Sequence, residues 1–190
     1  MAEEEAAEVA VEAPAEPAGP VASAILLEAC MLGKTNAIKS YVTKNGAEEI
    51  NLPTTKNGWS CLQVAAGYGR PETVRALIEL GAAADTKDKG GMTAVHAGAD
   101  TDETDVIRAL LETEGGKACV NGQDADGCTA LHYAAYSGRV DIVAELMRAG
   151  ADVEIKDGEG RTASEIAKEV KQDGVTKMIA NGPPEIAATA

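Results

Sequence analysis

A pattern of about 33 residues recurs along this chain and constrains its fold more than any other feature. Its clearest copy is Asp124–Asp157, which reads D-A-D-G-C-T-A-L-H-Y-A-A-Y-S-G-R-V-D-I-V-A-E-L-M-R-A-G-A-D-V-E-I-K-D. The hydroxyl residues near the start of successive copies are Ser60, Thr93, Thr129 and Thr162, at spacings of 33, 36 and 33. A unit this short cannot bury its apolar face alone, so stacked neighbours must cover that face.

Each copy predicts a turn followed by two short helices. In the clearest copy, Asp124–Gly127 is a turn cluster, Thr129 can cap a first helix, and Gly138 can end that helix in the left-handed conformation. We expect the two helices over Ala130–Ser137 and Arg139–Ala149. The apolar residues of the second helix share one face, as an amphipathic helix requires. They are Ile142, Val143, Leu146 and Met147.

The recurring unit resembles the ankyrin repeat. The T-P-L-H signature of that family stands here as S-C-L-Q, T-A-V-H, T-A-L-H and T-A-S-E, so its Pro is absent throughout. The resemblance covers roughly Val21–Ala180 and implies an all-α solenoid of stacked helix-turn-helix pairs with β-turn or hairpin loops. The expected units are approximately 21–54, 55–87, 88–123, 124–156 and 157–180. The first and last depart from the pattern, as end units that lack one neighbour do.

Charge separates the repeat region from its ends. Residues 1–20 contain six Glu and no Lys or Arg, and we expect them to form a disordered tail rich in Ala, Glu and Pro. This tail would serve for solubility or as an acidic arm for a basic partner. We expect residues 181–190 to be a flexible C-terminal tail. The net charge of −14, of which Val21–Asn181 carries −7, argues against nucleic acid and anionic membranes as partners.

Several classes of site and location are disfavoured by the sequence. The four Cys lie 31, 58 and 9 residues apart, which matches no metal-ligand or redox spacing, so we expect free thiols and no cofactor or metal. Neither a signal peptide nor an apolar run of membrane-spanning length is present. We therefore expect a cytoplasmic protein, with the nucleus as a second location.

The third unit is irregular. Asp102 stands where the neighbouring units have Gly69 and Gly138, and three residues are inserted around Gly115-Gly116-Lys117. An insertion in a solenoid is expected to form a loop that bulges from one face, and the two Gly would make it flexible. It is either a tolerated insertion or a specific contact.

The two histidines are the obvious candidates for catalysis. His96 and His132 both stand in the repeat signature, where the family uses the ring to hydrogen-bond the backbone of the turn. No nucleophile or carboxylate pair accompanies them consistently, and a Cys128–His132 pair is a weaker alternative still, so we expect structural roles and no catalytic site. Asn121 resembles the asparagine that some ankyrin proteins offer for hydroxylation, and we leave that modification open.

The resemblance also implies a concave groove formed by the turn tips and the first helices. The residues expected to face a partner there are Trp59, Tyr68, Met92, Asp100, Thr101, Cys128, Tyr136, Ser137 and Arg161. Trp and Tyr are typical anchors of protein interfaces. The alternative for Trp59 is that it folds back onto the N-terminal unit. Tyr133 is expected to point inward, into the core.

These features favour a non-enzymatic adaptor or scaffold that binds a protein partner through the groove as a monomer. The main alternative is a regulator that occludes a partner enzyme such as a kinase. A chaperone that uses the acidic tail to hold basic proteins is a third possibility. An enzyme in its own right is disfavoured, because the sequence contains no site constellation.

Overall fold

The computed structural model describes residues 24–183 and confirms the predicted all-α architecture. Eleven α-helices and one 3-10 helix occur in this range, where the only β-pairing is an isolated bridge between Lys156 and Thr162. The predicted tail at 1–20 lies outside the described residues, as do residues 184–190 of the predicted C-terminal tail. The α-helices are α1 (Ala24–Leu32), α2 (Thr35–Asn45), α3 (Cys61–Gly67), α4 (Pro71–Glu79), α5 (Ala94–Ala99), α6 (Thr104–Leu111), α7 (Glu114–Ala118), α8 (Ala130–Tyr136), α9 (Val140–Arg148), α10 (Ala163–Glu169) and α11 (Asp173–Asn181), and the 3-10 helix η1 spans Ala47–Asn51.

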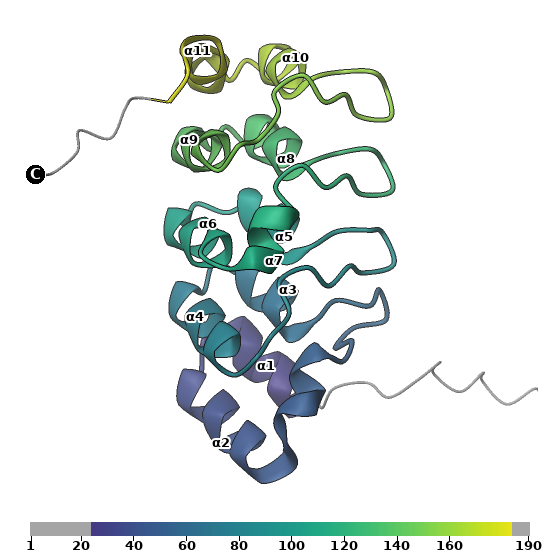
Figure 1. The fold of residues 1–190 in the computed structure, drawn as a ribbon, viewed down its shortest axis with the longest axis vertical. Coiled ribbons are helices and arrows are strands. Elements are labelled where there is room, and N and C mark those ends of the chain that lie inside the picture. The colour runs from purple at the N-terminus through teal and green to yellow at the C-terminus, as the bar shows by residue number, and fades with distance from the viewer. Residues whose placement is uncertain (1–23, 184–190) are drawn as a thin grey trace, which may run out of the picture.

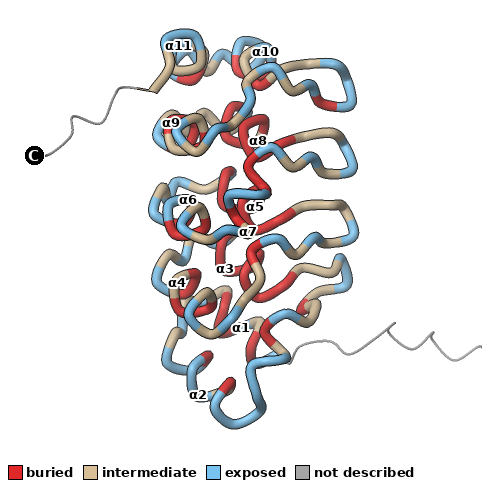
Figure 2. Tube along the Cα trace, viewed as in Figure 1, coloured by how far each residue is buried: buried red, intermediate tan, exposed pale blue. Residues whose placement is uncertain are grey.

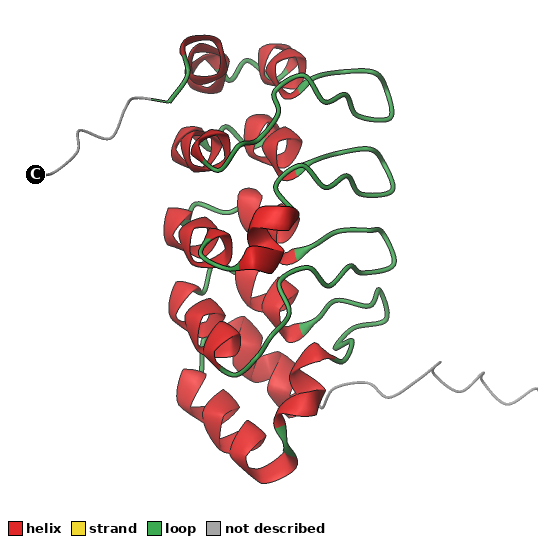
Figure 3. Cartoon of the chain, in the orientation of Figure 1, coloured by secondary structure: helices red, strands yellow, loops and turns green. Residues whose placement is uncertain are grey.

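Helix pairs stack into two layers (Figure 1). The first helices of the five units, α1, α3, α5, α8 and α10, pack on one another in chain order, and the second helices, α2, α4, α6, α9 and α11, form the other layer. The turns between units project from the same side of the array (Figure 3). We call the surface formed by the first helices and these turn tips the inner face.

The core lies between the two layers and along the first helices (Figure 2). First helices bury small residues on almost every side, such as Ala65, Ala66, Ala134 and Ala135, which lets neighbouring helices approach closely. Second helices bury one stripe, which in α9 consists of Ile142, Val143, Ala144 and Leu146. The buried residues form a continuous cluster from α1 to α11, so each unit depends on its neighbours for burial.

A column of backbone hydrogen bonds joins the turn tips of successive units. Lys89 N–H donates to Asn57 O at 3.0 Å, Ala125 N–H to Gly90 O at 2.8 Å, and Gly158 N–H to Asp126 O at 2.7 Å. The glycines of these turns allow the close approach. At Gly127, where φ is +75°, a Cβ would lie 2.7 Å from Gly158 N. The turns are therefore held at a fixed spacing from unit to unit.

The link between the two helices of a unit is closed in two different ways. Gly33, Gly69 and Gly138 have positive φ, as the sequence predicts for Gly138, and in the last unit Lys171 takes the same conformation at φ +60°. In the third unit Asp102 does not. There the hydroxyl of Thr101 donates to Gly98 O at 2.8 Å and accepts the N–H of Glu103 at 3.3 Å. This side-chain bridge replaces the left-handed residue.

The expectation of a flexible loop at Gly115-Gly116-Lys117 was wrong, because this segment is helix α7. The Thr113 hydroxyl caps the helix by accepting the N–H of Gly116 at 2.9 Å, and it donates to Leu110 O at 2.7 Å. Gly116 is buried, and a Cβ there would lie 2.0 Å from Leu110 O. The glycine thus permits a close backbone approach, which outweighs its low helix propensity.

Candidate functional site: the inner face

One side chain in α3, α5, α8 and α10 fixes the turn of its own unit, and in α3, α5 and α8 it also reaches the next unit. Gln63 Oε1 accepts the N–H of Ser60 at 2.7 Å, while its Nε2 donates to Met92 O at 2.7 Å. His96 and His132 repeat this arrangement in the following two units. In the last unit Glu165 accepts the N–H of Thr162 at 2.8 Å. The capping boxes predicted at Ser60–Gln63 and Thr162–Glu165 are both present.

Both histidines are buried and neutral in this role. Their Nδ1 atoms accept backbone N–H groups of Thr93 and Thr129, at 3.2 Å and 3.1 Å, so the proton sits on Nε2. Nε2–H then donates to Gly122 O in one case and to Arg161 O in the other. Burial lowers the pKa of His96 and of His132 and outweighs the opposing hydrogen bonds and carboxylates. Both ring nitrogens are used by the framework, as the repeat signature predicts.

Aspartates hold the turns in shape. The Asp124 carboxylate accepts the N–H groups of Asp126 and Cys128, and its other oxygen accepts the hydroxyl of Tyr133 at 2.6 Å. Asp157 does the same one unit later, with the N–H groups of Glu159 and Arg161. Tyr133 is half-buried and meets the His96 ring edge-on, with centroids 6.1 Å apart, in accord with its predicted inward position.

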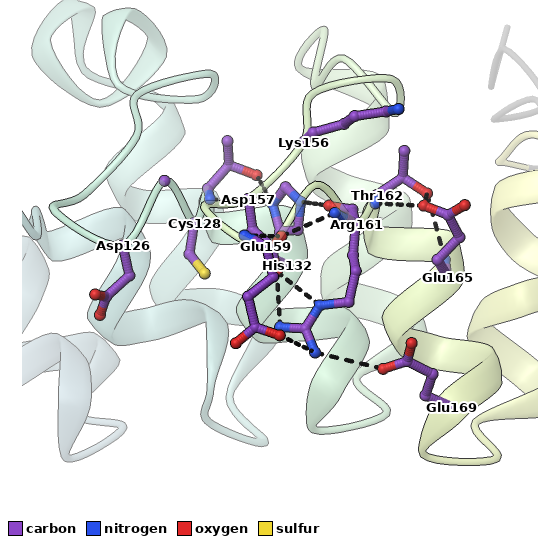
Figure 4. A network of polar contacts seen from close by, with 12 residues as sticks. Asp126, Cys128, His132, Lys156, Asp157, Glu159, Arg161, Thr162, Glu165 and Glu169 are labelled. Atoms are coloured by element: carbon purple, nitrogen blue, oxygen red, sulfur yellow. Dashed lines mark hydrogen bonds and ion pairs between the residues drawn. The ribbon is translucent and has the colours of Figure 1, made fainter.

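The Arg161 guanidinium is surrounded by carboxylates (Figure 4). Its Nε and Nη2 donate to Asp157 Oδ2 at 3.0 Å and 2.8 Å, and its Nη1 lies 3.0 Å from Glu159 and 3.4 Å from Glu169. The hydrogen bond with Asp157 raises the pKa of Arg161. Burial alone would raise the pKa of Asp157, but the hydrogen bonds from Arg161 and Glu159 hold it below its usual value. The guanidinium of this arginine is therefore already paired with three carboxylates.

Exposed apolar side chains gather where the first helices end. Tyr68, Tyr136 and Val170 expose 49%, 64% and 36% of their surface. Tyr68 and Val170 occupy equivalent places, each directly before the left-handed residue that closes its unit. These residues belong to the inner face, so this face presents separate apolar contacts along the array.

A pocket of about 210 Å³ lies between α8 and α10. It brings together three of the predicted partner-facing residues, Cys128, Tyr136 and Arg161. Sequence reasoning missed the other walls, which come chiefly from α10 and its end. The lining is completed by His132, Tyr133, Ile166, Glu169 and Val170. Burial, followed by the nearby aspartates, raises the pKa of the Cys128 thiol to about 11, which keeps it protonated at neutral pH.

A second cleft, of about 450 Å³, lies where α3 and α5 end. It contains the predicted residues Tyr68, Asp100 and Thr101. The hydroxyl of Ser137, another predicted contact residue, donates to Asp100 and does not itself line the cleft. The cleft is lined further by Gly67, Gly69, Arg70, Asp102, Glu103 and Arg139. Its charged residues are thus mostly ones that the sequence did not single out.

Two further predicted contact residues, Trp59 and Met92, are partly buried in the fold. The ring of Trp59 lies over α3, because a Cβ on Gly67 would meet its Cζ3 atom at 3.2 Å, and the side chain is half-buried against the core. Trp59 packs on its own unit, and its backbone N–H donates to the Thr55 hydroxyl. Met92 is also half-buried, and its carbonyl accepts the Gln63 amide. Trp59 therefore contributes to packing, and Met92 contributes a backbone acceptor to the framework.

The side chain of Asn121 bridges two units. Its Nδ2 donates to Gly150 O at 3.0 Å, and its Oδ1 accepts the N–H of Asp152 at 2.8 Å. Asn51 makes the same pair of bonds with Gly81 and Ala83. Asn121 therefore joins loops of the third and fourth units, and its hydroxylation stays a prediction without a test.

Metal-binding and membrane-spanning features were sought over residues 24–183. Within that range, His, Cys, Asp and Glu side chains form no group of three or more that could hold a metal ion. Over the same range, every helix is too short or too polar to cross a membrane.

A family model described as ankyrin repeats in three copies matches residues 26–121 and 80–157. The chain belongs to the ankyrin-repeat family. One similar protein is a probable 26S proteasome regulatory subunit, p28, of Saccharomyces cerevisiae, which is 31% identical over 140 residues. That match covers 73% of this chain but only 60% of the yeast protein. A homologue of transient receptor potential cation channel subfamily A member 1 from Caenorhabditis elegans is 37% identical over 82 residues, or 43% of this chain and 6% of that protein.

Proposed function

We propose that this ankyrin-repeat chain is a non-enzymatic interaction module that acts in the cytoplasm or nucleus and binds a protein partner through the inner face. The exposed tyrosines carry this proposal. Tyr68 and Tyr136 lie at the ends of α3 and α8, and each leaves about half or more of its surface exposed. Because Tyr is an enriched anchor of protein interfaces, its exposure on a pre-organised surface favours binding. Both histidines use both ring nitrogens in the framework, so neither is available as a catalytic acid or base.

The yeast relative favours one class of partner. Its printed name describes a probable regulatory subunit of the 26S proteasome, and its likeness extends over most of the repeat region. We therefore propose a proteasome subunit as the first partner to test. Purified 26S proteasome mixed with the chain should co-elute with it on size exclusion. Separate elution would exclude this partner and leave the general binding role open.

Affinity capture tests the binding surface itself. The full chain is used as bait beside a Tyr68→Ala/Tyr136→Ala variant. The control, Glu112→Ala/Lys177→Ala, alters exposed residues of the layer formed by the second helices. We leave Trp59 intact because it packs on Gly67 and its loss would disturb the fold. A partner retained by wild type and control but lost by the tyrosine variant supports the proposal. Equal capture by all three proteins would contradict it.

The same capture separates a scaffold from an inhibitor. If the captured partner is an enzyme, its turnover is measured with rising concentrations of the chain. A regulator that occludes the active site lowers turnover to near zero at saturation, whereas a scaffold leaves turnover unchanged. The Tyr68→Ala/Tyr136→Ala variant should not lower turnover, which would tie any inhibition to the inner face.

A further inference from the structure

The pocket between α8 and α10 has apolar walls but an open mouth. Ile166 forms its base and is 6% exposed, while Tyr136 and Val170 stand at its rim and remain accessible to solvent. An apolar hollow of about 210 Å³ is large enough for one bulky side chain of a partner. Because burial of such a side chain releases water from both surfaces, the pocket is an anchor site for an apolar group.

The charges around this pocket restrict what can lie beside that anchor. Arg161 is the one cation of the lining, and its guanidinium already contacts Asp157, Glu159 and Glu169. An incoming carboxylate would have to break these contacts to reach it. The side chains of Glu159 and Glu169 are 74% and 57% exposed, so they still offer oxygen atoms to a cation from outside.

More carboxylates lie on either side of the pocket. Asp126 is exposed at the turn tip above it. In the neighbouring unit the cleft beside Tyr68 contains Asp100, Asp102 and Glu103. Its two cations are already engaged, since Arg139 pairs with Asp102 and Arg70 donates to Met31 O at 3.1 Å.

The pKa of the Cys128 thiol reflects the same carboxylates. Burial is the largest cause of its raised pKa, and Asp124, Asp157 and Asp126 raise it further, while Arg161 opposes them without reversing the shift. At the start of α10, hydrogen bonds with Thr162 lower the pKa of Glu165, and Lys156 and Lys168 lower it further. Lys156 extends away from the pocket in Figure 4. The pocket mouth is therefore acidic with its own cation neutralised.

We propose that the partner of this pocket is a basic segment of a protein chain, which inserts one apolar side chain between Tyr136 and Val170 and places Lys or Arg beside Glu159 and Glu169. This inference rests on the proposed function and specifies its partner. Neighbouring helices are about 8–10 Å apart, which is about three residues of extended chain. A second basic residue about three positions from the anchor would reach the carboxylates at Asp100–Glu103.

A random library of displayed 12-residue peptides tests this proposal on the full chain. We expect enriched peptides to combine an aromatic or large aliphatic residue with Lys or Arg next to it and about three positions away. Their affinity should fall at least tenfold in a Glu159→Lys/Glu169→Lys variant, and in wild type it should weaken as salt rises. The control Glu48→Lys/Glu112→Lys carries the same change of net charge at exposed sites outside the pocket, and should bind like wild type.

The outcomes separate the two proposals. Acidic or uncharged enriched peptides, or equal losses in the two Lys variants, would overturn the basic segment while leaving a binding surface in place. If no peptide is enriched over a Tyr136→Ala/Val170→Ser variant, the pocket proposal is overturned. The affinity capture described above then decides separately whether the inner face binds a folded partner.

Discussion

The fourth and fifth units of the array differ at two equivalent positions, and the difference follows from what lies beyond each unit. In the fourth unit His132 accepts a hydrogen bond from its own turn and donates one to the next, whereas Glu165 in the fifth unit only accepts. Gly138 closes the fourth unit beneath the Gln172 side chain, while within residues 24–183 no unit is stacked beyond the equivalent Lys171 of the fifth. A unit with a neighbour on each side needs side-chain contacts toward both neighbours. The last described unit needs them toward one neighbour only.

The largest expected effect comes from placing the end unit's residue inside the array. Gln63→Glu would set a buried carboxylate against Met92 O, where the native amide donates at 2.7 Å. We expect the free energy of unfolding to fall by about 3 kcal/mol, because a buried charge would face an acceptor. Urea denaturation measures the change.

The matched substitutions complete this test. Gln63→His introduces the residue used by the next two units and should cost about 1 kcal/mol or less, since both bonds can form. Glu165→Gln should leave the urea midpoint nearly unchanged, because the end unit needs only an acceptor. A Gln63→Glu protein as stable as wild type would remove the distinction between interior and end units.

The second position should give a smaller effect. A Cβ on Gly138 would lie 2.4 Å from Gln172 Oε1, and the φ of +73° adds backbone strain. We expect Gly138→Ala to cost about 2 kcal/mol. The double variant Gly138→Ala/Gln172→Ala removes the steric clash with the Gln172 side chain. Its loss of unfolding free energy should therefore shrink to about 1 kcal/mol, which is the backbone strain alone. Lys171→Gly should instead raise stability by about 0.5 kcal/mol in the same thermal or urea measurements, and a loss there would contradict the strain argument.

The histidines give the third and fourth units a dependence on pH near neutrality that the second and fifth units, with Gln63 and Glu165 in the equivalent place, lack. The pKa values of His96 and His132 are lowered in the folded chain, so their contribution to stability is present above the unfolded value of about 6.5 and is lost as pH falls below it. The urea midpoint should therefore decrease between about pH 6.5 and 5. His96→Gln/His132→Gln retains an acceptor and a donor and should flatten this decrease. An unchanged slope would show that other groups cause it.

The sequence was sufficient for features that repeat and insufficient for features that occur once. Ser60 and Gln63 predicted a capping box because their spacing alone places both groups at a helix start. Helix α7 was not predicted, because a Gly-Gly run normally indicates a loop, whereas here the Thr113 cap and the close approach of Gly116 to Leu110 O accompany a helix. Thr101 is predicted as a contact residue and lines the second cleft, but its place in the repeat does not reveal that its hydroxyl also replaces a missing glycine.

The candidate site was predicted only in part for a similar reason. Cys128, Tyr136 and Arg161 were selected by their places in the repeat, and they meet in one pocket. Val170 was missed because the end unit closes with Lys171 in place of Gly, which hides the equivalence with Tyr68. The acidity of the pocket depends on which carboxylates converge on Arg161, and this depends on tertiary contacts that spacing alone does not give.

The smallest effect on stability is expected at the pocket rim. Tyr136 is 64% exposed, so Tyr136→Ala should change the free energy of unfolding by less than about 0.5 kcal/mol. Its effect on binding should be much larger, because exposed aromatic residues act as anchors. A large loss of stability in thermal unfolding would show that this ring belongs to the fold and would weaken its assignment to the inner face.

The column of bonds between turn tips also determines where this chain tolerates a change of length. The donors Lys89, Ala125 and Gly158 are 36 and 33 residues apart, yet each makes the same bond with the preceding tip. The three extra residues are taken up as α7 before the turn begins. Residues inserted between a second helix and the next turn can therefore change the surface outside the inner face. The spacing between successive turn tips, which a partner would contact, stays the same.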